Sequence, residues 1–451
     1  MLMSNSIVDF GGRHSFLSGR ASASAKVSSL LSIMADRRGH LLGLTVLYLL
    51  LSVEYYRFVY GYFCLRMGFQ FGVEPVSFMA GIVMMVALMA FMSLARRADD
   101  CLYAVAMVVS VLCTIPQIIL FQVGRASCYG ALYALLLVFL LTYPGVRLPQ
   151  LGFAKVSDNC RRWLMPVLAV LALLPFAFTF GLPSDLSVLS MDERIYEVRQ
   201  LASQRGNLIT SYLQGPLCKV LFPMLVIMGL SNLRRQWWMA LVGVVGMVYL
   251  FLVNPEKSIL FSVMVVLLCY PFDDYRVKAG VFLYALLTLV FVSVLLNLLT
   301  GNIMVESIIV LRLFFIPALV SDAYFAFFDK TPVLLSHSVL GAAFEYPYAV
   351  EPSRLIGEMM YARNTINCNT GIIADGFMNF GHVGALCFVA LTALVIRFLC
   401  ACSCDSRYFG LLFLLVFTFL NSALLTTMLT HGGWCLLLAC MFLIPPRRAA
   451  V

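Results

Sequence analysis

The stretch AGVFLYALLTLVFVSVLLNLLT, residues 279–300, contains no charged residue. A helix needs about 20 predominantly apolar residues to cross the roughly 30 Å hydrocarbon core of a bilayer. The strands of a membrane barrel alternate in polarity over about 10 residues instead. This stretch therefore predicts a transmembrane helix and not a barrel strand.

Comparable apolar runs recur along most of the chain. Of its 451 residues, 62% are hydrophobic and 12% are charged, whereas soluble domains contain about 45–50% apolar and about 25% charged residues. We predict an all-α polytopic membrane protein, with a flexible basic cytoplasmic tail at 1–40 and a single transmembrane domain at 41–451. About twelve transmembrane helices are expected, at 41–63, 73–95, 101–121, 127–144, 163–181, 216–232, 236–253, 257–272, 279–300, 376–400, 408–428 and 432–445.

Lysine and arginine predict the orientation, because basic residues are retained in cytoplasmic loops. Most of them precede the first predicted span or lie in every second connection after it. These residues are Arg13, Arg20, Lys26, Arg37, Arg38, Arg96, Arg97, Lys155, Arg161, Arg162, Arg234, Arg235, Arg276, Lys278, Arg407, Arg447 and Arg448. Both termini are therefore predicted to be cytoplasmic. The net charge of +9 follows from this topology and requires no nucleic-acid partner.

Two long loops are predicted on the outer side of the membrane, at 182–215 and 301–375. Loops of this length are usually functional when they are not disordered. The first carries Arg194, Arg199 and Arg205 on a strongly helical stretch, against the bias that keeps basic residues inside. These arginines either form a solvated helix face or bind an anion, since guanidinium groups bind phosphate oxygens bidentately.

The second loop contains RLFFIPALVSDAYFAFFDKTPVLLSHS, residues 312–338. A thirteenth span here would place Arg407 and Arg447 outside, so we predict that its helix lies in the outer membrane interface. Arg312 is then surrounded by bulky apolar residues. An arginine so placed is a functional candidate, unless its side chain extends to the lipid headgroups.

A polar stretch, NCNTGIIADGFMNFGHVG, occupies residues 367–384 at the start of the tenth span. Asn369 or Thr370 is predicted to cap this helix, leaving outward-facing N–H groups that suit an anion. Further polar residues follow at Asp375, Asn379 and His382. Their spacing of i, i+4 and i+7 predicts one shared helix face. That face is either a binding site or a polar seam that joins helices by hydrogen bonds.

These segments resemble the Wzy-type O-antigen and capsule polymerases of bacterial inner membranes. Those proteins show an arginine, a Pro-Ala pair, a tyrosine and a Phe-Phe pair, followed by Asn-Thr-Gly, an aspartate and Asn-Phe-Gly-x-x-Gly. The matching positions are Arg312, Pro317, Ala318, Tyr324, Phe327, Phe328, Asn369, Thr370, Gly371, Asp375, Asn379, Phe380, Gly381 and Gly384. The resemblance extends over residues 250–385 and includes NPEKSIL at 254–260.

The resemblance implies that the chain polymerises undecaprenyl-diphosphate-linked repeat units at the periplasmic face of the bacterial inner membrane. In this reaction an acceptor hydroxyl attacks an anomeric carbon and a lipid diphosphate leaves, so cations near the leaving group lower the barrier. The candidates for binding the diphosphate are Arg312, Lys257, Arg194, Arg199 and Arg205. His337 and Asp375 are alternative candidates for a base, which makes them, with Arg312, the catalytic candidates.

Sugar hydroxyls suit amide, carboxylate and phenol side chains in the same region. The candidates are Glu345, Tyr346, Tyr348, Asn367, Asn369 and Asn379, although such aromatics also serve in packing. We predict a metal-independent enzyme without a cofactor. The acidic pairs Asp99–Asp100 and Asp273–Asp274 are predicted to be cytoplasmic, and the outer pair Asp192–Glu193 lies beside arginines that could neutralise it. The run Cys400, Cys402 and Cys404 also lacks a second half that would complete a metal site. The expected partners are the lipid-linked glycan donor and acceptor and membrane lipids, with a chain-length regulator and a flippase implied by the resemblance.

Three alternatives remain. A ligase that transfers finished glycan to lipid A core would share the donor and the topology, and only its acceptor would differ. A lipid-phosphate sugar transferase with a large first outer loop fits less well, because the loop after the first span is short here. A polyprenyl-linked glycan transporter or flippase would show inverted repeats with broken helices and mid-span charges, of which Glu54 is the main example.

Overall fold

The computed structural model describes residue 29, residues 31–95, 100–146, 148–183, 194–338, residue 341, and residues 345–363 and 365–447. The side chains of Arg194, Tyr196 and Lys257 lie outside this description. Within the described ranges the structure consists of helices and their connections, and its only β-type pairing is a single bridge between Cys404 and Pro446.

Nine helical segments within the described ranges are long and apolar enough to cross a membrane. They are α2–η1–α3 (Arg37–Met67), α4 (Pro75–Leu94), α5–η3–α6 (Asp100–Val123), α8 (Asp158–Phe180), α10–η5–α11 (Leu208–Ser231), α12 (Leu233–Val253), α14 (Tyr275–Thr300), α15–η6–α16 (Met304–Phe328) and α18 (Ile372–Ala401). Four shorter apolar helices are α7 (Tyr129–Thr142), α13 (Lys257–Cys269), α19 (Phe409–Asn421) and α21–η8 (Gly433–Leu443). The connections contain α9 (Arg194–Arg205), α17 (Pro352–Tyr361) and α20 (Leu424–Leu429). The predicted all-helical class is therefore confirmed for the described residues, and the number of apolar helices suits a multi-pass membrane protein.

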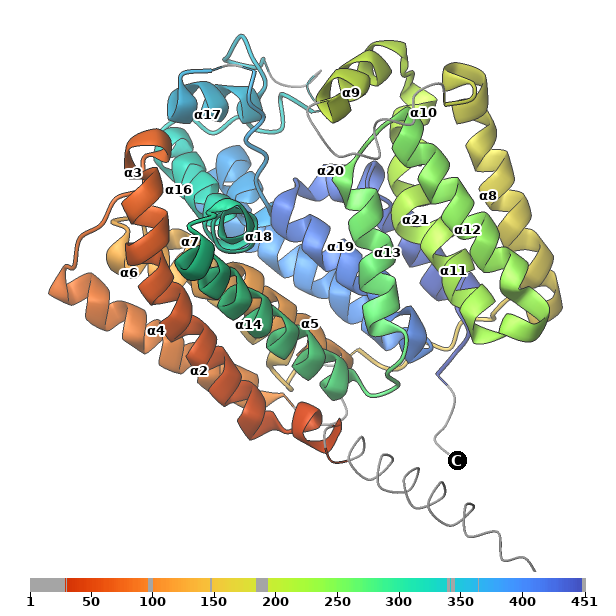
Figure 1. The fold of residues 1–451 in the computed structure, drawn as a ribbon, viewed down its shortest axis with the longest axis horizontal. Coiled ribbons are helices and arrows are strands. Elements are labelled where there is room, and N and C mark those ends of the chain that lie inside the picture. Colours follow the sequence, from red (N-terminus) through yellow and green to blue (C-terminus); the bar gives the residue numbers. More distant parts are fainter. Residues whose placement is uncertain are drawn as a thin grey trace, which may run out of the picture.

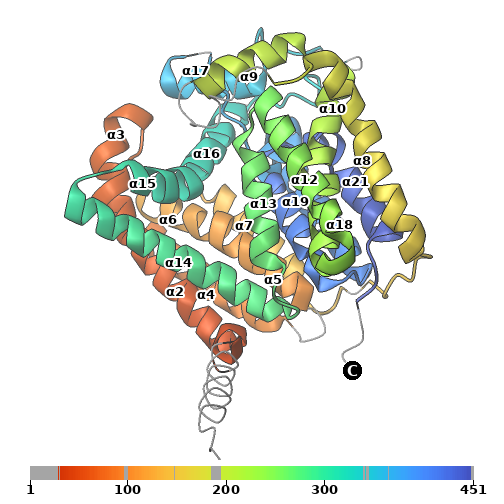
Figure 2. The same cartoon turned by 45° about the vertical axis from the view of Figure 1, so that its right-hand side comes forward.

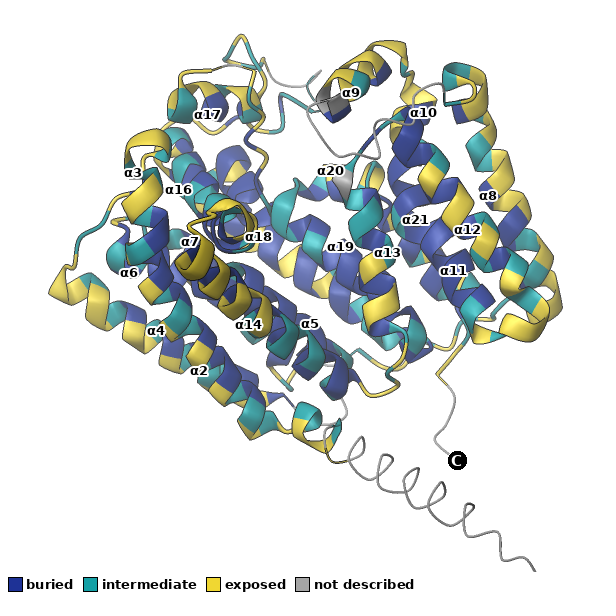
Figure 3. Ribbon diagram, in the orientation of Figure 1, coloured by how far each residue is buried: buried dark blue, intermediate teal, exposed yellow. Residues whose placement is uncertain are grey.

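The helices pack into two groups with a shared centre (Figure 1). In one group α5 packs against α14 and α7, and α4 packs against α7; in the other, α11 packs along α12. Between them lie α13, α18 and α19, where α13 packs against α19. Buried residues fill the interior of both groups, whereas α4, α8 and α12 turn exposed residues outward (Figure 3). Many of these exposed residues are apolar, such as Val76 and Phe178, as a surface in contact with lipid requires.

Basic side chains gather at one end of the molecule, which we call the basic end. Arg276 pairs with Asp100 at 2.7 Å, and Arg397 donates to the carbonyls of Leu140 and Tyr143, at the end of α7, at 2.8 and 2.9 Å. Further basic residues here are Arg37, Lys155, Arg161, Lys278, Arg407 and Arg447. The start of α2 lies at this end (Figure 1). Seven of the basic residues that the sequence assigns to one side of a membrane thus lie at this end: Arg37, Lys155, Arg161, Arg276, Lys278, Arg407 and Arg447.

All twelve predicted apolar runs form helices, with shifted boundaries. The first helix begins earlier than predicted, because Asp36 accepts hydrogen bonds from the backbone N–H groups of Arg38 and Gly39. Such a cap satisfies donors that the first helical turn leaves unpaired. Residues 1–28 and residue 30 of the predicted tail lie outside the described residues, so the tail stays a prediction.

The helix Met304–Phe328 packs into the body of the protein. Phe314, Phe315 and Phe328 are fully buried, and α16 (Ile316–Phe328) packs against α18, α7 and α6 (Ile115–Val123). Its predicted place in the outer membrane interface stays a prediction. Figure 2 shows α15 (Met304–Glu306) lying across the body while α16 rises toward α17. Aromatic residues suit a membrane interface and a packed core equally well, so composition alone did not distinguish the two.

Candidate functional site

The N-terminus of α18 is buried against a neighbouring helix. Its first residue is preceded by Gly371, and no side chain caps it. A Cβ at Gly371 would collide with the carbonyl oxygen of Leu420 at the end of α19, so this approach requires glycine. Thr370 is buried, with its hydroxyl 3.3 Å from that of Ser321. The predicted cap by Asn369 or Thr370, with outward-facing N–H groups, is therefore wrong.

A break divides α18 after its second turn. Phe380 (φ −139°, ψ 21°) and Gly381 (φ 62°, ψ −148°) leave the helical conformation, and the positive φ of Gly381 suits a residue without a side chain. His382, beyond the break, is exposed, and its Nδ1 lies 2.7 Å from the hydroxyl of Tyr133. The prediction that His382 shares a helix face with the polar residues before it is therefore not met.

Before the break, Asp375 and Asn379 form a buried hydrogen-bond network with two other segments. Asp375 is 3% exposed and Asn379 is 0% exposed. The Asp375 carboxylate accepts from the Leu424 N–H at 2.8 Å and from the Asn379 amide at 3.0 Å. Asn379 accepts from the Leu335 N–H at 2.9 Å. Asp375 thus caps the first turn of α20 from another helix, and Asn379, fully enclosed, is not placed to contact a sugar.

A second polar group, which the sequence analysis did not identify, surrounds Lys219 on η5 (Leu217–Leu221). This π-helical turn follows Pro216, and π-helical turns are frequent at functional sites. Lys219 is half-buried, and its ammonium donates one long hydrogen bond, 3.4 Å, to the hydroxyl of Thr418. A lysine can donate three, and Lys219 has no further hydrogen bond or ion pair with any described residue.

His431, in the turn between α20 and α21, lies within electrostatic range of Lys219. This turn packs on α10 (Leu208–Pro216), where a Cβ at Gly215 would collide with the backbone of Thr430 and His431. Burial, and then the positive charge of Lys219, lower the pKa of His431 to about 4. His431 is therefore a neutral imidazole at pH 7, with one nitrogen that donates and one that accepts.

Side chains from two more segments complete what we call the Lys219 cluster. It consists of Gln214, Lys219, Asn254, Glu256 and His431. The Asn254 amide donates to the Gln214 side-chain oxygen at 2.6 Å, whereas the amide nitrogen of Gln214, in a side chain only 8% exposed, has no partner among the described residues. Glu256 supplies an opposite charge within electrostatic range of Lys219. Asn254 and Glu256 belong to the NPEKSIL segment, so part of the resemblance lies at this cluster.

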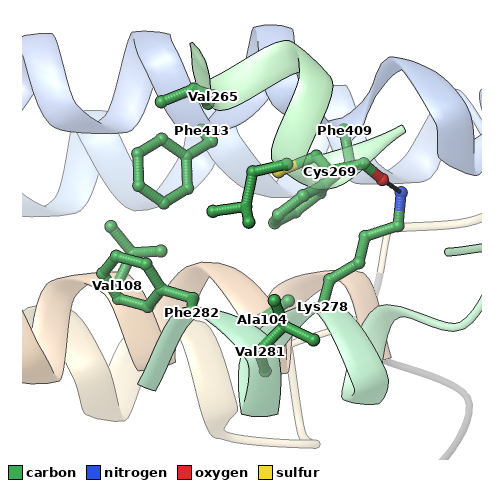
Figure 4. Close-up of a pocket in the computed structure, with 11 residues that line it drawn as sticks. Ala104, Val108, Val265, Cys269, Lys278, Val281, Phe282, Phe409 and Phe413 are labelled. Atoms are coloured by element: carbon green, nitrogen blue, oxygen red, sulfur yellow. Dashed lines mark hydrogen bonds between the residues drawn. The ribbon is translucent and has the colours of Figure 1, made fainter. Parts of the chain in front are cut away.

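Lys278, at the basic end, shows what a lysine with a structural role looks like. It is 3% exposed and donates to the carbonyls of Cys269 at 2.8 Å and Ser406 at 2.5 Å. Figure 4 shows its side chain reaching from α14 to the Cys269 carbonyl, beside a cavity of about 20 Å³. Lys278 thus joins the end of α13, the start of α14 and the segment before α19.

The arginines predicted to bind diphosphate are exposed wherever the structure describes them. Arg312 lies on η6 (Ser307–Phe315) and has no hydrogen bond or ion pair with a described residue, Asp375 included. Arg199 and Arg205 are exposed on α9. The predictions for the Arg194 and Lys257 side chains lie outside the described residues. The structure therefore does not join the predicted cations to Asp375.

The predicted base His337 and the predicted sugar ligands follow α16. His337 is half-buried, its Nδ1 has no partner among the described residues, and burial lowers its pKa. The Tyr346 hydroxyl donates to the Val350 carbonyl at 2.7 Å, and the ring of Tyr348 packs near Phe327 at 5.6 Å. Packing is thus one role of these tyrosines. The remaining predicted sugar ligands, all exposed, are Glu345, Asn367 and Asn369.

One sequence signal would have identified Lys219. It is the single charged residue in the predicted span 216–232, and an ionisable residue inside such a span is a functional candidate by default. His431, in the THGG turn, carries no comparable signal, because its approach to Lys219 depends on the packing of α20 and α21.

No protein-family model, curated protein or solved structure matches the chain. In the described part of the chain, no group of three or more His, Cys, Asp or Glu side chains is arranged to hold a metal ion. Metal independence remains a prediction.

Proposed function

We propose that this chain polymerises undecaprenyl-diphosphate-linked oligosaccharide repeat units at the periplasmic face of the bacterial inner membrane. The motif resemblance to Wzy-type polymerases supports the proposal. About twelve crossings, with both termini in the cytoplasm, would put the basic end inside. The Lys219 cluster and the segments 182–215 and 301–375 then lie toward the periplasm.

The Lys219 cluster is the observation that carries the proposal. Glycosyl transfer breaks the bond between the anomeric carbon and the diphosphate oxygen, and negative charge develops on the departing lipid diphosphate. A preorganised cation at that position lowers the barrier. Lys219 has an ammonium group whose hydrogen-bonding capacity is largely unused. The unpartnered amide nitrogen of Gln214 adds a neutral donor to the Lys219 cluster.

His431 supplies the second requirement, an acceptor for the hydroxyl proton. In its neutral form it can accept a hydrogen bond from the attacking hydroxyl. Its low pKa makes it a weak base in the free protein. A diphosphate bound beside it offsets the charge of Lys219 and raises that pKa toward its ordinary value. In this scheme the bound lipid-linked glycan donor makes His431 a stronger base. His337 is the alternative base.

The residues of the resemblance then take distinct roles. Asp375 and Asn379 are positioning residues, because they hold the first turn of α20 and thereby the turn that carries His431. Arg312, with its exposed guanidinium, attracts the anionic donor from outside, together with the arginines of α9. Lys257 remains a diphosphate candidate. No metal or other cofactor is required, and a chain-length regulator and a flippase remain the proposed protein partners.

Purified protein in lipid nanodiscs, supplied with a lipid-linked repeat unit, tests this proposal. A polymerase yields a ladder of products that differ by one repeat. Transfer only to added lipid A core, without a ladder, would establish a ligase instead. Absence of both products from folded protein would refute the enzymatic proposal.

A transporter of polyprenyl-linked glycans is the second candidate function, and one observation favours it. Transporters often bind their substrates at discontinuous helices, and α18 is broken at Phe380 and Gly381. Proteoliposomes that contain a fluorescent lipid-linked glycan distinguish the two. Protein-dependent movement of the label between leaflets without new glycosidic bonds supports transport, and label that stays in its leaflet excludes it.

A further inference from the structure

Two cysteines far apart in the sequence meet at the basic end. Cys101, on α5 (Asp100–Val109), and Cys400, near the end of α18, are separated by 299 positions, yet their sulfur atoms are 2.8 Å apart. A disulfide bond is about 2.05 Å long, so the two thiols already lie within roughly an ångström of bonding distance. Both residues are half-buried.

Further cysteines share this environment. A cavity of about 30 Å³ is lined by Cys101, Cys400, Cys404 and Cys440. The Cys404 thiol is directed toward backbone carbonyls, with its sulfur 3.5 Å from the carbonyl oxygen of Cys440. The thiols of Cys404 and Cys440 also interact with each other, so Cys101 and Cys400, with sulfur atoms 2.8 Å apart, are one of two thiol pairs at this cavity.

We propose that Cys101 and Cys400 are a redox-active dithiol that a hydroperoxide converts to an intramolecular disulfide. One thiolate attacks the peroxide, the O–O bond breaks, and a sulfenic acid forms while an alcohol or water leaves. The second thiol attacks the sulfenic sulfur, so that the S–S bond forms and water departs. Two electrons pass from the sulfurs to the peroxide, and a dithiol reductant reverses the reaction.

The location decides which state predominates. If the basic end faces the cytoplasm, the compartment keeps thiols reduced, and disulfides there are transient. The dithiol is then the resting form, and the disulfide forms on oxidative exposure. The bond would tie α5 to α18, whose other end carries Asp375. This inference does not depend on the proposed glycosyl transfer.

Disulfide mapping of the full-length protein tests the inference. Protein purified under reducing conditions is treated with an alkyl hydroperoxide, and the remaining thiols are blocked with N-ethylmaleimide before digestion. We expect a linked pair of peptides containing Cys101 and Cys400, and its loss after dithiothreitol treatment. Recovery of both cysteines as maleimide adducts, or linkage of either one to Cys404 or Cys440, would overturn the inference.

Matched variants separate this pair from general thiol oxidation. Cys101→Ser and Cys400→Ser should each abolish the link, whereas Cys160→Ser and Cys387→Ser, at exposed positions, should leave it intact. The wild-type map requires no variant, so it still decides the matter if a substitution prevents folding. A link that survives in Cys101→Ser would contradict the assignment.

Discussion

Two lysines on apolar helices of this protein, Lys278 and Lys219, have opposite surroundings. At the basic end, Lys278 is 3% exposed and gives its hydrogens to two backbone carbonyls. In the Lys219 cluster, Lys219 is half-buried and makes one long contact with Thr418. Both stand in apolar helices, and the cost of placing a charge there applies to both.

The difference indicates which polar groups hold the fold and which are available to a ligand. Lys278 and Arg397 donate hydrogen bonds to backbone carbonyl oxygens and therefore join helices at fixed positions. The Lys219 ammonium and the Gln214 amide nitrogen lack such partners. A buried polar group without a partner costs about 1–3 kcal/mol, and a bound anion would remove that cost at the Lys219 cluster.

Replacing each lysine by glutamine should produce the largest and most divergent effects. Lys219→Gln removes a cation that acts on the leaving group, so polymer formation should fall about 100-fold while the unfolding temperature stays near that of wild type. Lys278→Gln leaves a carbonyl without its donor and should lower the unfolding temperature. Product ladders and thermal unfolding in detergent measure the two effects. Wild-type polymerisation by Lys219→Gln would contradict the comparison.

Removing the Asp375 carboxylate should weaken the fold first and the reaction second. The Asn side chain in Asp375→Asn can accept only one of the two hydrogen bonds. Its NH2 group then faces another donor, either the Leu424 N–H or the Asn379 amide, at a cost of about 1–3 kcal/mol. Asn379→Ala should cost less stability when Asp375 is already replaced, because the effects of substitutions within one hydrogen-bond network are not additive. Thermal unfolding of both single variants and the double variant measures this coupling.

Asn367→Ala, at an exposed position in the same segment, is the matched control and should leave stability unchanged. If Asp375→Asn abolishes the reaction with no loss of stability, Asp375 is a catalytic residue and its positioning role is refuted.

Stability should fall on acidification because of His431. Its pKa in the folded protein is about 4, below the ordinary value of about 6.5. Between these values the unfolded chain binds a proton that the folded chain does not, so stability is lost as the pH falls through this window, by roughly 3 kcal/mol in total. Unfolding temperatures measured from pH 7 to pH 4 should show this loss in wild type.

Two variants isolate that contribution. His431→Gln should flatten the pH dependence, and Lys219→Gln should reduce it in part, because burial is the larger cause and the charge of Lys219 the second. An unchanged slope in His431→Gln would show that other groups are responsible.

The smallest effect is expected at Arg312. Its side chain is exposed and unpaired among the described residues, so Arg312→Ala should change stability by less than about 0.5 kcal/mol. If it attracts the anionic donor, polymerisation should slow by up to about tenfold at low salt and less at high salt. Arg66→Ala, at an exposed position on α3 (Gly61–Met67), is the control. Equal polymerisation rates for both variants at low salt would show that Arg312 does not attract the donor.

The sequence predicted the helices well because apolar runs of sufficient length have few alternatives to a helix in a membrane. Seven of the basic residues that it assigned to one side lie together at the basic end. It did not reveal that Met304–Phe328 packs into the body of the protein, because aromatic residues suit an interface as well as a core. The break at Phe380 and Gly381 depends on a close backbone approach between Gly376 and Gly384, which spacing alone does not reveal.

The candidate site was predicted less well for a related reason. Asp375 and Asn379 were recognised, but one of the two roles left open, a polar seam, is the one their hydrogen bonds fit. Lys219 and His431 are 212 positions apart, and their proximity arises from the packing of α20 and α21 against α10. Distant pairs of this kind are set by tertiary structure, not by local pattern.

A cryo-electron microscopy map of the full chain in nanodiscs with undecaprenyl diphosphate tests the central claim most directly. The account predicts diphosphate density within hydrogen-bonding distance of the Lys219 ammonium and beside the His431 ring. Diphosphate density held elsewhere, with Lys219 still bonded only to Thr418, would contradict it.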